Sequence, residues 1–98
     1  MNITTTEALI DAILDNDLNA VTDLLAKNTN PNGCLDRDRI TPLHFAAQNN
    51  CTAIAKKLIL AGANVHAKTA MENNTPYDIA CLHQHEEMKA LLSAYSKY

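Results

Sequence analysis

Apolar residues recur at spacings of three and four along this chain, in short segments separated by polar turns. Such spacing predicts amphipathic helices, because it places the apolar side chains on one helical face. Start and stop signals agree with this reading: Thr41 and Pro42 suit a helix N-terminus, and Gly62 suits a left-handed residue that ends a helix. The helices are expected near residues 7–15, 19–26, 42–48, 52–60, 75–82 and 86–95.

The pattern repeats with an offset of 34 residues. Asn49 and Asn50 turn the chain between the two central helices, since asparagine tolerates the left-handed conformation. Three copies of a helix pair, near residues 5–38, 39–72 and 73–98, are therefore predicted within one all-α domain that spans residues 1–98. The recurring residues are Thr41, Pro42 and Ala46, which return as Thr75, Pro76 and Ala80, and Leu43, Ala46, Leu58 and Ile59, which are preceded by Leu9, Ala12, Leu24 and Leu25.

The segment TPLHFAAQNNCTAIAKKLILAGANVHAK, from Thr41 to Lys68, resembles an ankyrin repeat. That family has a period of ~33 residues and the signature T-P-L-H-x-A. The resemblance covers roughly residues 5–95; it is closest in the central copy and weakest in the first. It implies a short α-solenoid of stacked helix–turn–helix pairs, with finger-like turns at residues 29–40 and 63–74 and terminal copies that cap the array.

The resemblance also implies a function, which is to bind another protein through the concave face. Apolar contact is expected from Ile40, Met71 and Leu82, and charged neighbours are expected to orient the partner. An alternative is a structural role in which the array stacks on itself or docks on a larger scaffold; an exposed apolar end face would indicate it. The positions that the resemblance assigns to the binding face are Arg37, Asp38, Ile40, Lys68, Met71, Glu72 and Asn74 in the fingers, and Leu14, Asp15, Gln48, Asn49, Leu82 and His83 at the first helices.

Charge narrows the class of partner. The net charge is −3, and residues 1–38 contain seven acids and two bases, which gives −5 for that third of the chain. A nucleic-acid partner is not expected, because such domains carry a basic excess. The acidic third is either a solvated face or the footprint of a basic partner, to which Asp15 and Asp38 would contribute. Lys56 and Lys57 are expected on the convex side, away from the binding face.

The three cysteines form no C-x-x-C pair, and no signal peptide is evident. This pattern indicates reduced thiols and a cytoplasmic protein, or one in the host cytosol if the chain is a microbial effector. Cys81 is expected in the core and Cys51 partly exposed. No apolar run reaches the ~20 residues that span a bilayer, so neither a membrane partner nor an anchor is expected. We expect a monomer.

The histidines invite a metal interpretation, which the pattern does not favour. Zinc needs three or four convergent ligands, and the rings of His83 and His85 are expected to diverge at their turn. The resemblance implies structural hydrogen bonds for His44 and for His85. No nucleophile–base pair, phosphate loop or paired carboxylate is present. We therefore expect no metal, no cofactor and no catalytic residue.

Overall fold

The computed structural model describes residues 5–34 and 38–96 of the chain. Within these residues the secondary structure is entirely helical, which confirms the all-α prediction. None of the described helices is long and apolar enough to cross a membrane. In chain order the helices are α1 (Thr5–Leu14), α2 (Leu18–Ala26), α3 (Pro42–Gln48), α4 (Thr52–Leu60), α5 (Pro76–Leu82) and α6 (Glu86–Tyr95).

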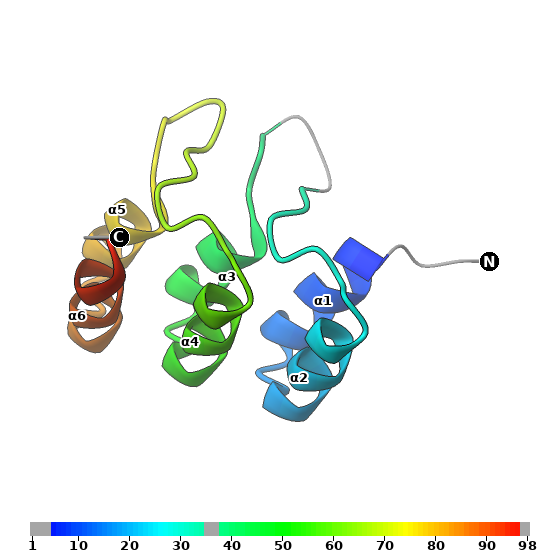
Figure 1. Cartoon of the computed structure of the whole chain (residues 1–98). Coiled ribbons are helices and arrows are strands. Elements are labelled where there is room, and N and C mark those ends of the chain that lie inside the picture. Colours follow the sequence, from blue (N-terminus) through cyan, green and yellow to red (C-terminus); the bar gives the residue numbers. More distant parts are fainter. Residues whose placement is uncertain (1–4, 35–37, 97–98) are drawn as a thin grey trace.

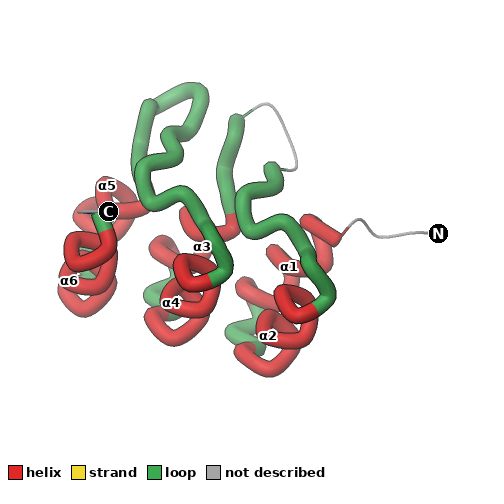
Figure 2. Tube along the Cα trace, in the orientation of Figure 1, coloured by secondary structure: helices red, strands yellow, loops and turns green. Residues whose placement is uncertain are grey.

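The helices form three antiparallel pairs that stack side by side (Figure 1). The first helix of each pair packs against the first helix of the next, as α1 does on α3 and α3 on α5. The second helices form a parallel layer in which α4 lies between α2 and α6. The two long connections leave the helical layers on one side as irregular loops, shown in green in Figure 2. They are the fingers that the sequence predicted.

The backbone repeats with the same offset of 34 residues as the sequence. Residues with positive φ are uncommon outside glycine, and asparagine is enriched among them. Here such residues end the helices and shape the fingers at equivalent positions in successive repeats, which confirms the left-handed conformations expected at Asn50 and Gly62. They are Asn16, Asn50 and Gln84 after the first helices, Asn28 and Gly62 after the second helices, and Arg39 and Asn73 in the fingers.

Threonine side chains cap the N-termini of α3 and α5, the two helices that start at a Thr-Pro pair. Thr41 caps α3 by accepting a hydrogen bond from the backbone N–H of His44, and Thr75 caps α5 through Asp78 in the same way. In both, the side chain of the third helical residue, His44 or Asp78, accepts a hydrogen bond from the backbone N–H of the capping threonine. These reciprocal bonds satisfy two backbone donors that a helix start would leave unpaired.

The core runs through all three helix pairs as one cluster of aliphatic side chains. Two alanines, Ala46 and Ala80, are fully buried where the pairs meet. Small residues there let neighbouring helices approach closely. The largest fully buried aliphatic side chains are Leu9, Ile13, Leu43, Ile54, Leu58, Met88 and Leu92.

Two sequence-based expectations about cysteines are wrong. Cys51 is buried and Cys81 is exposed, the reverse of what was expected. Cys81 is equivalent to Ala47, which is buried in the middle of the stack. Among the residues the structure describes, nothing covers the same side of the third repeat. Cys51 is buried because its Sγ faces the carbonyl of Ile13 in the preceding repeat, at 3.8 Å.

Replacing Ala46 or Ala80 with leucine is expected to lower the free energy of unfolding by ~1–3 kcal/mol, because the added atoms have no space between the helix pairs. Urea denaturation followed by circular dichroism would measure the change. The matched control is Ala53→Leu on the exposed side of α4, which should have little effect. A wild-type midpoint for the Ala46 variant would contradict the packing described here.

Candidate protein-binding groove

A hollow of about 270 Å³ lies where the second finger, residues 63–74, meets α3 and α5. The finger contributes four residues to it, and the end of the first finger contributes two. The other four come from α3, from α5 and from the turn after α5. We call this site the groove hollow; it is lined by Asp38, Ile40, Gln48, Thr69, Met71, Glu72, Asn74, Ile79, Leu82 and His83.

Most of the predicted binding-face positions converge on the groove hollow. Sequence reasoning missed Thr69 and Ile79. Ile79 precedes Leu82 by three residues on α5, so helical spacing could have found it. Thr69 carried no comparable signal. The predicted residues that line the groove hollow are Asp38, Ile40, Gln48, Met71, Glu72, Asn74, Leu82 and His83.

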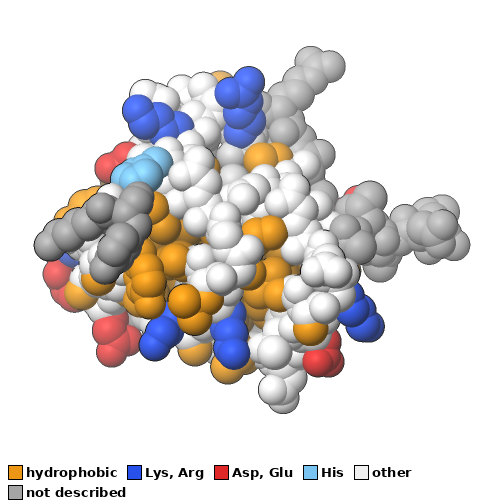
Figure 3. Space-filling view, viewed as in Figure 1, with side chains coloured by type: hydrophobic (Ala, Val, Ile, Leu, Met, Phe, Trp, Pro, Cys, Tyr) orange, Lys and Arg blue, Asp and Glu red, His pale blue; other side chains and the backbone are white. Residues whose placement is uncertain are grey.

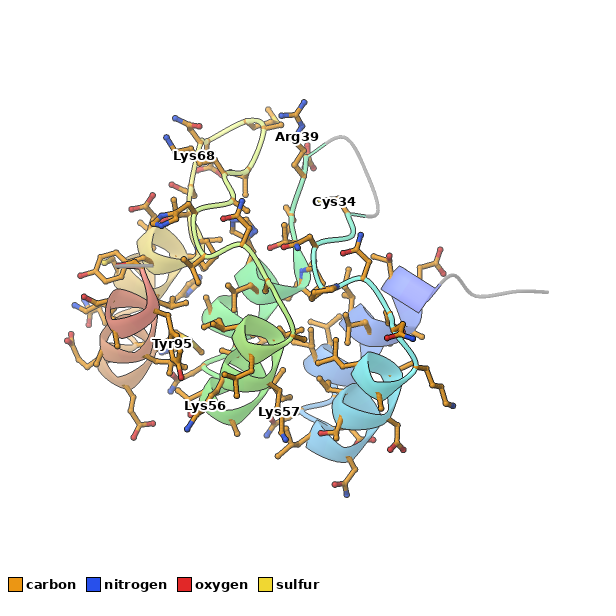
Figure 4. All side chains as sticks on the ribbon, in the orientation of Figure 1. Cys34, Arg39, Lys56, Lys57, Lys68 and Tyr95 are labelled. Carbon is orange, nitrogen blue, oxygen red and sulfur yellow. The ribbon has the colours of Figure 1, made fainter. Side chains whose placement is uncertain are left out.

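The other predicted positions lie elsewhere. Leu14 and Asp15 are exposed at the end of α1, in the first repeat, and Asn49 is exposed at the end of α3. Lys68 lies on the second finger, and it lines a separate hollow together with Cys34 and Arg39 of the first finger (Figure 4). Arg37, also predicted, falls outside the described residues.

Backbone hydrogen bonds hold the finger in place against its neighbours. The N–H of Ala70 donates to the carbonyl of Asp38 at 2.8 Å, which joins the second finger to the first. Within the finger, the N–H of Thr69 donates to the carbonyl of Asn74 at 2.9 Å. The N–H of Asn74 donates in return to the Thr69 hydroxyl at 3.1 Å. Hydrogen bonds of backbone groups, and not of side chains alone, thus hold the walls of the groove hollow together.

His44 ties this finger to α3. The backbone N–H of Thr41 donates to His44 Nδ1 at 3.0 Å, so Nδ1 is the unprotonated ring nitrogen. Nε2 therefore carries the proton and donates to the carbonyl of Asn74 at 2.9 Å. Burial lowers the pKa of His44 below its ordinary value of 6.5, although hydrogen bonds to the carbonyls of Asn74 and Ala67 oppose this. The buried neutral ring confirms the structural role predicted for His44.

The lining of the groove hollow combines exposed apolar side chains with carboxylates. Met71 is 83% exposed and Leu82 is 68% exposed, whereas Ile40 and Ile79 are half-buried below them. Among the described residues of the lining, Asp38 and Glu72 are the charged ones, and none is lysine or arginine. The site is therefore apolar at its floor and negatively charged at its edge.

The cysteine and histidine side chains considered as a nucleophile or as metal ligands have surroundings that fit a structural role. Burial raises the pKa of the Cys51 thiol, which disfavours the nucleophilic thiolate. The rings of His83 and His85 stack with centroids 5.7 Å apart, so the expectation that they diverge is wrong. His85 Nε2 is 3.0 Å from the carbonyl of Gln48, the structural bond predicted for it. No group of three metal-binding side chains is found in residues 5–34 and 38–96.

An excess of chelator is expected to leave the melting temperature of the protein unchanged, because the described residues include no group of three metal-binding side chains. Thermal unfolding with and without chelator, followed by circular dichroism, would measure this. A fall of several degrees that added zinc reverses would contradict the expectation and would revive the pair of His83 and His85 as ligands.

Comparison with known proteins places this geometry in a family. A family model described as ankyrin repeats in three copies matches residues 9–98. Protein fem-1 homolog A of Homo sapiens is 52% identical over 44 residues, which are 45% of this chain and 6% of that protein. Protein fem-1 homolog A of Rattus norvegicus is also 52% identical over 44 residues, 7% of its length. The matched segment is thus a small part of each relative. Because the family model covers most of the chain, the protein belongs to the ankyrin-repeat family.

Proposed function

We propose that this protein is a non-enzymatic binding module that seats a segment of a partner protein in the groove hollow. Ankyrin repeats are in general protein–protein interaction modules. The observation that carries the proposal is the exposure of Met71 and Leu82 beside two half-buried isoleucines. Large apolar side chains exposed around a concavity are typical of a site that a partner covers.

The partner that fits best presents an apolar side chain next to a basic one. The apolar side chain would contact Met71, Leu82 and Ile40, and the lysine or arginine would face Asp38 and Glu72. Charge complementarity of this kind speeds association and selects the partner. Asp15 and Lys68 would contact only a partner segment that extends beyond the groove hollow. With three repeats the contact area is expected at or below ~800 Å² on each partner.

Within this proposal the protein acts as a monomer in a reducing compartment such as the cytoplasm. Its thiols at Cys34, Cys51 and Cys81 are all free, which supports that placement. A regulatory subunit, an inhibitor and a microbial effector would each use a groove of this kind in the same way. These roles differ in the partner, not in the site.

The alternative, a self-stacking or scaffold-docking element, depends on an exposed apolar end face. The residues that would form one are not widely exposed. Leu9, Ile10 and Ile13 are buried, and Leu91 and Tyr95 are half-buried. This burial favours the binding module over the assembly role.

Selection of a displayed random-peptide library on the immobilised protein would test the proposed function. We expect enriched peptides that combine lysine or arginine with a large apolar residue. Replacing Met71 and Leu82 together with alanine should weaken their binding by at least about tenfold, because both side chains are exposed contacts. It should leave the unfolding midpoint nearly unchanged, since neither side chain is buried in the core.

The matched control is the double variant Lys56→Ala and Lys57→Ala on the other side of the molecule, which should retain the basic peptides. Reversing Asp38 to lysine should slow their association, and the slowing should fade as salt rises. Retention of every enriched basic peptide by the Met71 and Leu82 variant would show that the groove hollow is not the site.

A further inference from the structure

A second apolar feature lies on the opposite side of the stack, on the second helices. Leu60 ends α4 and is 66% exposed. The equivalent position is alanine in the other two repeats, Ala26 and Ala94. A solvent-facing position at the end of an amphipathic helix ordinarily carries a small or polar residue. The central repeat therefore departs from this pattern, and the exposed leucine is not needed to fill the core.

Leu60 borders a hollow of about 500 Å³, which we call the outer-helix hollow. It lies between the end of α4, the turn that follows it and the end of α6. Figure 3 views this side and shows apolar side chains gathered on the surface between α4 and α6. Asn64 and His66 also line the hollow, and none of the described lining residues is acidic. The apolar lining residues are Ile59, Leu60, Ala63, Val65 and Tyr95.

Two lysines lie one helical turn before Leu60 on α4. Lys56 and Lys57 precede Leu60 by four and three residues on α4, which places all three on one face of the helix. Figure 4 shows both lysines below Tyr95 on the viewed side. Neither lysine forms an ion pair with another described residue. The ion pair among the described residues joins Lys89 to Glu86 on α6. Their ammonium groups are thus available to a partner, next to an apolar surface.

We propose that the outer-helix hollow, together with Lys56 and Lys57 on the preceding turn of α4, forms a second docking surface, which takes an acidic, amphipathic segment of a protein partner. An apolar side chain of the segment would enter the hollow against Leu60 and Tyr95. An aspartate or glutamate beside it would meet Lys56 and Lys57. The charge preference is the reverse of that at the groove hollow, whose edge carries Asp38 and Glu72. The two faces therefore select different segments and can be occupied together.

A protein segment fits this surface better than a lipid bilayer does. The apolar surface is concave and bounded by helix ends, so it suits a protruding side chain. A flat headgroup layer would contact Leu60 and the lysines but leave Ile59 and Val65 uncovered. Stable attachment of a protein to an anionic membrane also takes more basic residues than two. A single inserted side chain held by two charges is the contact that this geometry favours.

The same random-peptide library tests the second surface separately from the first. Peptides enriched on the wild-type protein would be sorted by which variant loses them. We expect a set rich in aspartate and glutamate with a large apolar residue, weakened at least about tenfold by the double variant Lys56→Glu and Lys57→Glu. Leu60→Ala alone should weaken the same set and provides a test that changes no charge. The Met71 and Leu82 double variant should retain this set, so failure of one surface is distinguishable from failure of the other.

Amide chemical shifts would then locate the bound peptide. Titrating an acidic peptide from the library into labelled protein should move the signals of residues 59–66 and spare those of residues 69–74, the part of the second finger that lines the groove hollow. The proposal is overturned if no acidic set emerges, or if its binding survives both the charge reversal and Leu60→Ala. It is also overturned if vesicles of phosphatidylserine and phosphatidylcholine, rather than any peptide, bind the wild-type protein and lose binding in those variants.

Discussion

Replacing Leu58 with alanine is expected to lower the free energy of unfolding by about 2–5 kcal/mol. Leu58 is fully buried at the centre of the stack, where it belongs to the cluster shared by all three helix pairs. Removing its branched end takes away buried apolar surface and leaves a cavity that neighbouring repeats cannot fill without moving. A domain of this size has roughly 5–15 kcal/mol of stability in total. The variant is therefore expected to lie near the limit of folding.

The matched control is Leu60→Ala, two residues away on the same helix. Leu60 is mostly exposed, so its truncation removes little buried surface and should change stability only slightly. Urea denaturation of both variants, followed by circular dichroism, would compare them directly. Equal losses at the two positions would mean that the helical face assigned to the core is wrong.

Replacing His44 with alanine is expected to destabilise the protein by about 2–4 kcal/mol, through lost packing and unpaired polar groups. The buried ring accepts from the N–H of Thr41 and lies 2.9 Å from the carbonyl of Asn74. Its loss leaves that N–H without its partner and removes one of the bonds that join the finger to α3. Because Asn74 lines the groove hollow, we also expect weaker binding of the basic peptides.

His44 should also make stability depend on pH. Burial lowers its pKa in the folded protein below the ordinary value of 6.5, which the unfolded chain retains. The contribution of His44 to the free energy of unfolding is then complete above about pH 6.5. It declines as the pH falls from there toward the pKa of the folded protein, because in that range only the unfolded chain takes up the proton. The stability difference between wild type and His44→Ala should therefore narrow between about pH 7 and pH 5. A difference that is constant, or that widens at low pH, would contradict a buried neutral ring.

Local features of this protein could be predicted from its sequence. The order of the helices, the capping role of Thr41 and the left-handed conformations at Asn50 and Gly62 all follow from residues within one or two turns of each position. Helical periodicity, capping and backbone sterics act over that range. Equivalence across the 34-residue offset extended the local reasoning to His44 and His85, whose structural hydrogen bonds are confirmed.

The surfaces depended on how the repeats stack. Asp38 and Met71 lie 33 residues apart in sequence, yet both line one hollow because the second finger bonds to the first. Lys68 belongs to the same finger but lies in the hollow on its other side.

The sequence by itself thus determined the repeat offset, the order of the helices and the cap at Thr41. Only the tertiary structure decided that Cys51 is buried and Cys81 exposed, which predicted residues meet in the groove hollow, and that Leu60 stands beside a second hollow. The physical reason is that helical period and capping are local properties of the chain. Burial, in contrast, depends on whether a neighbouring repeat covers a given face, and residue pattern alone does not specify that.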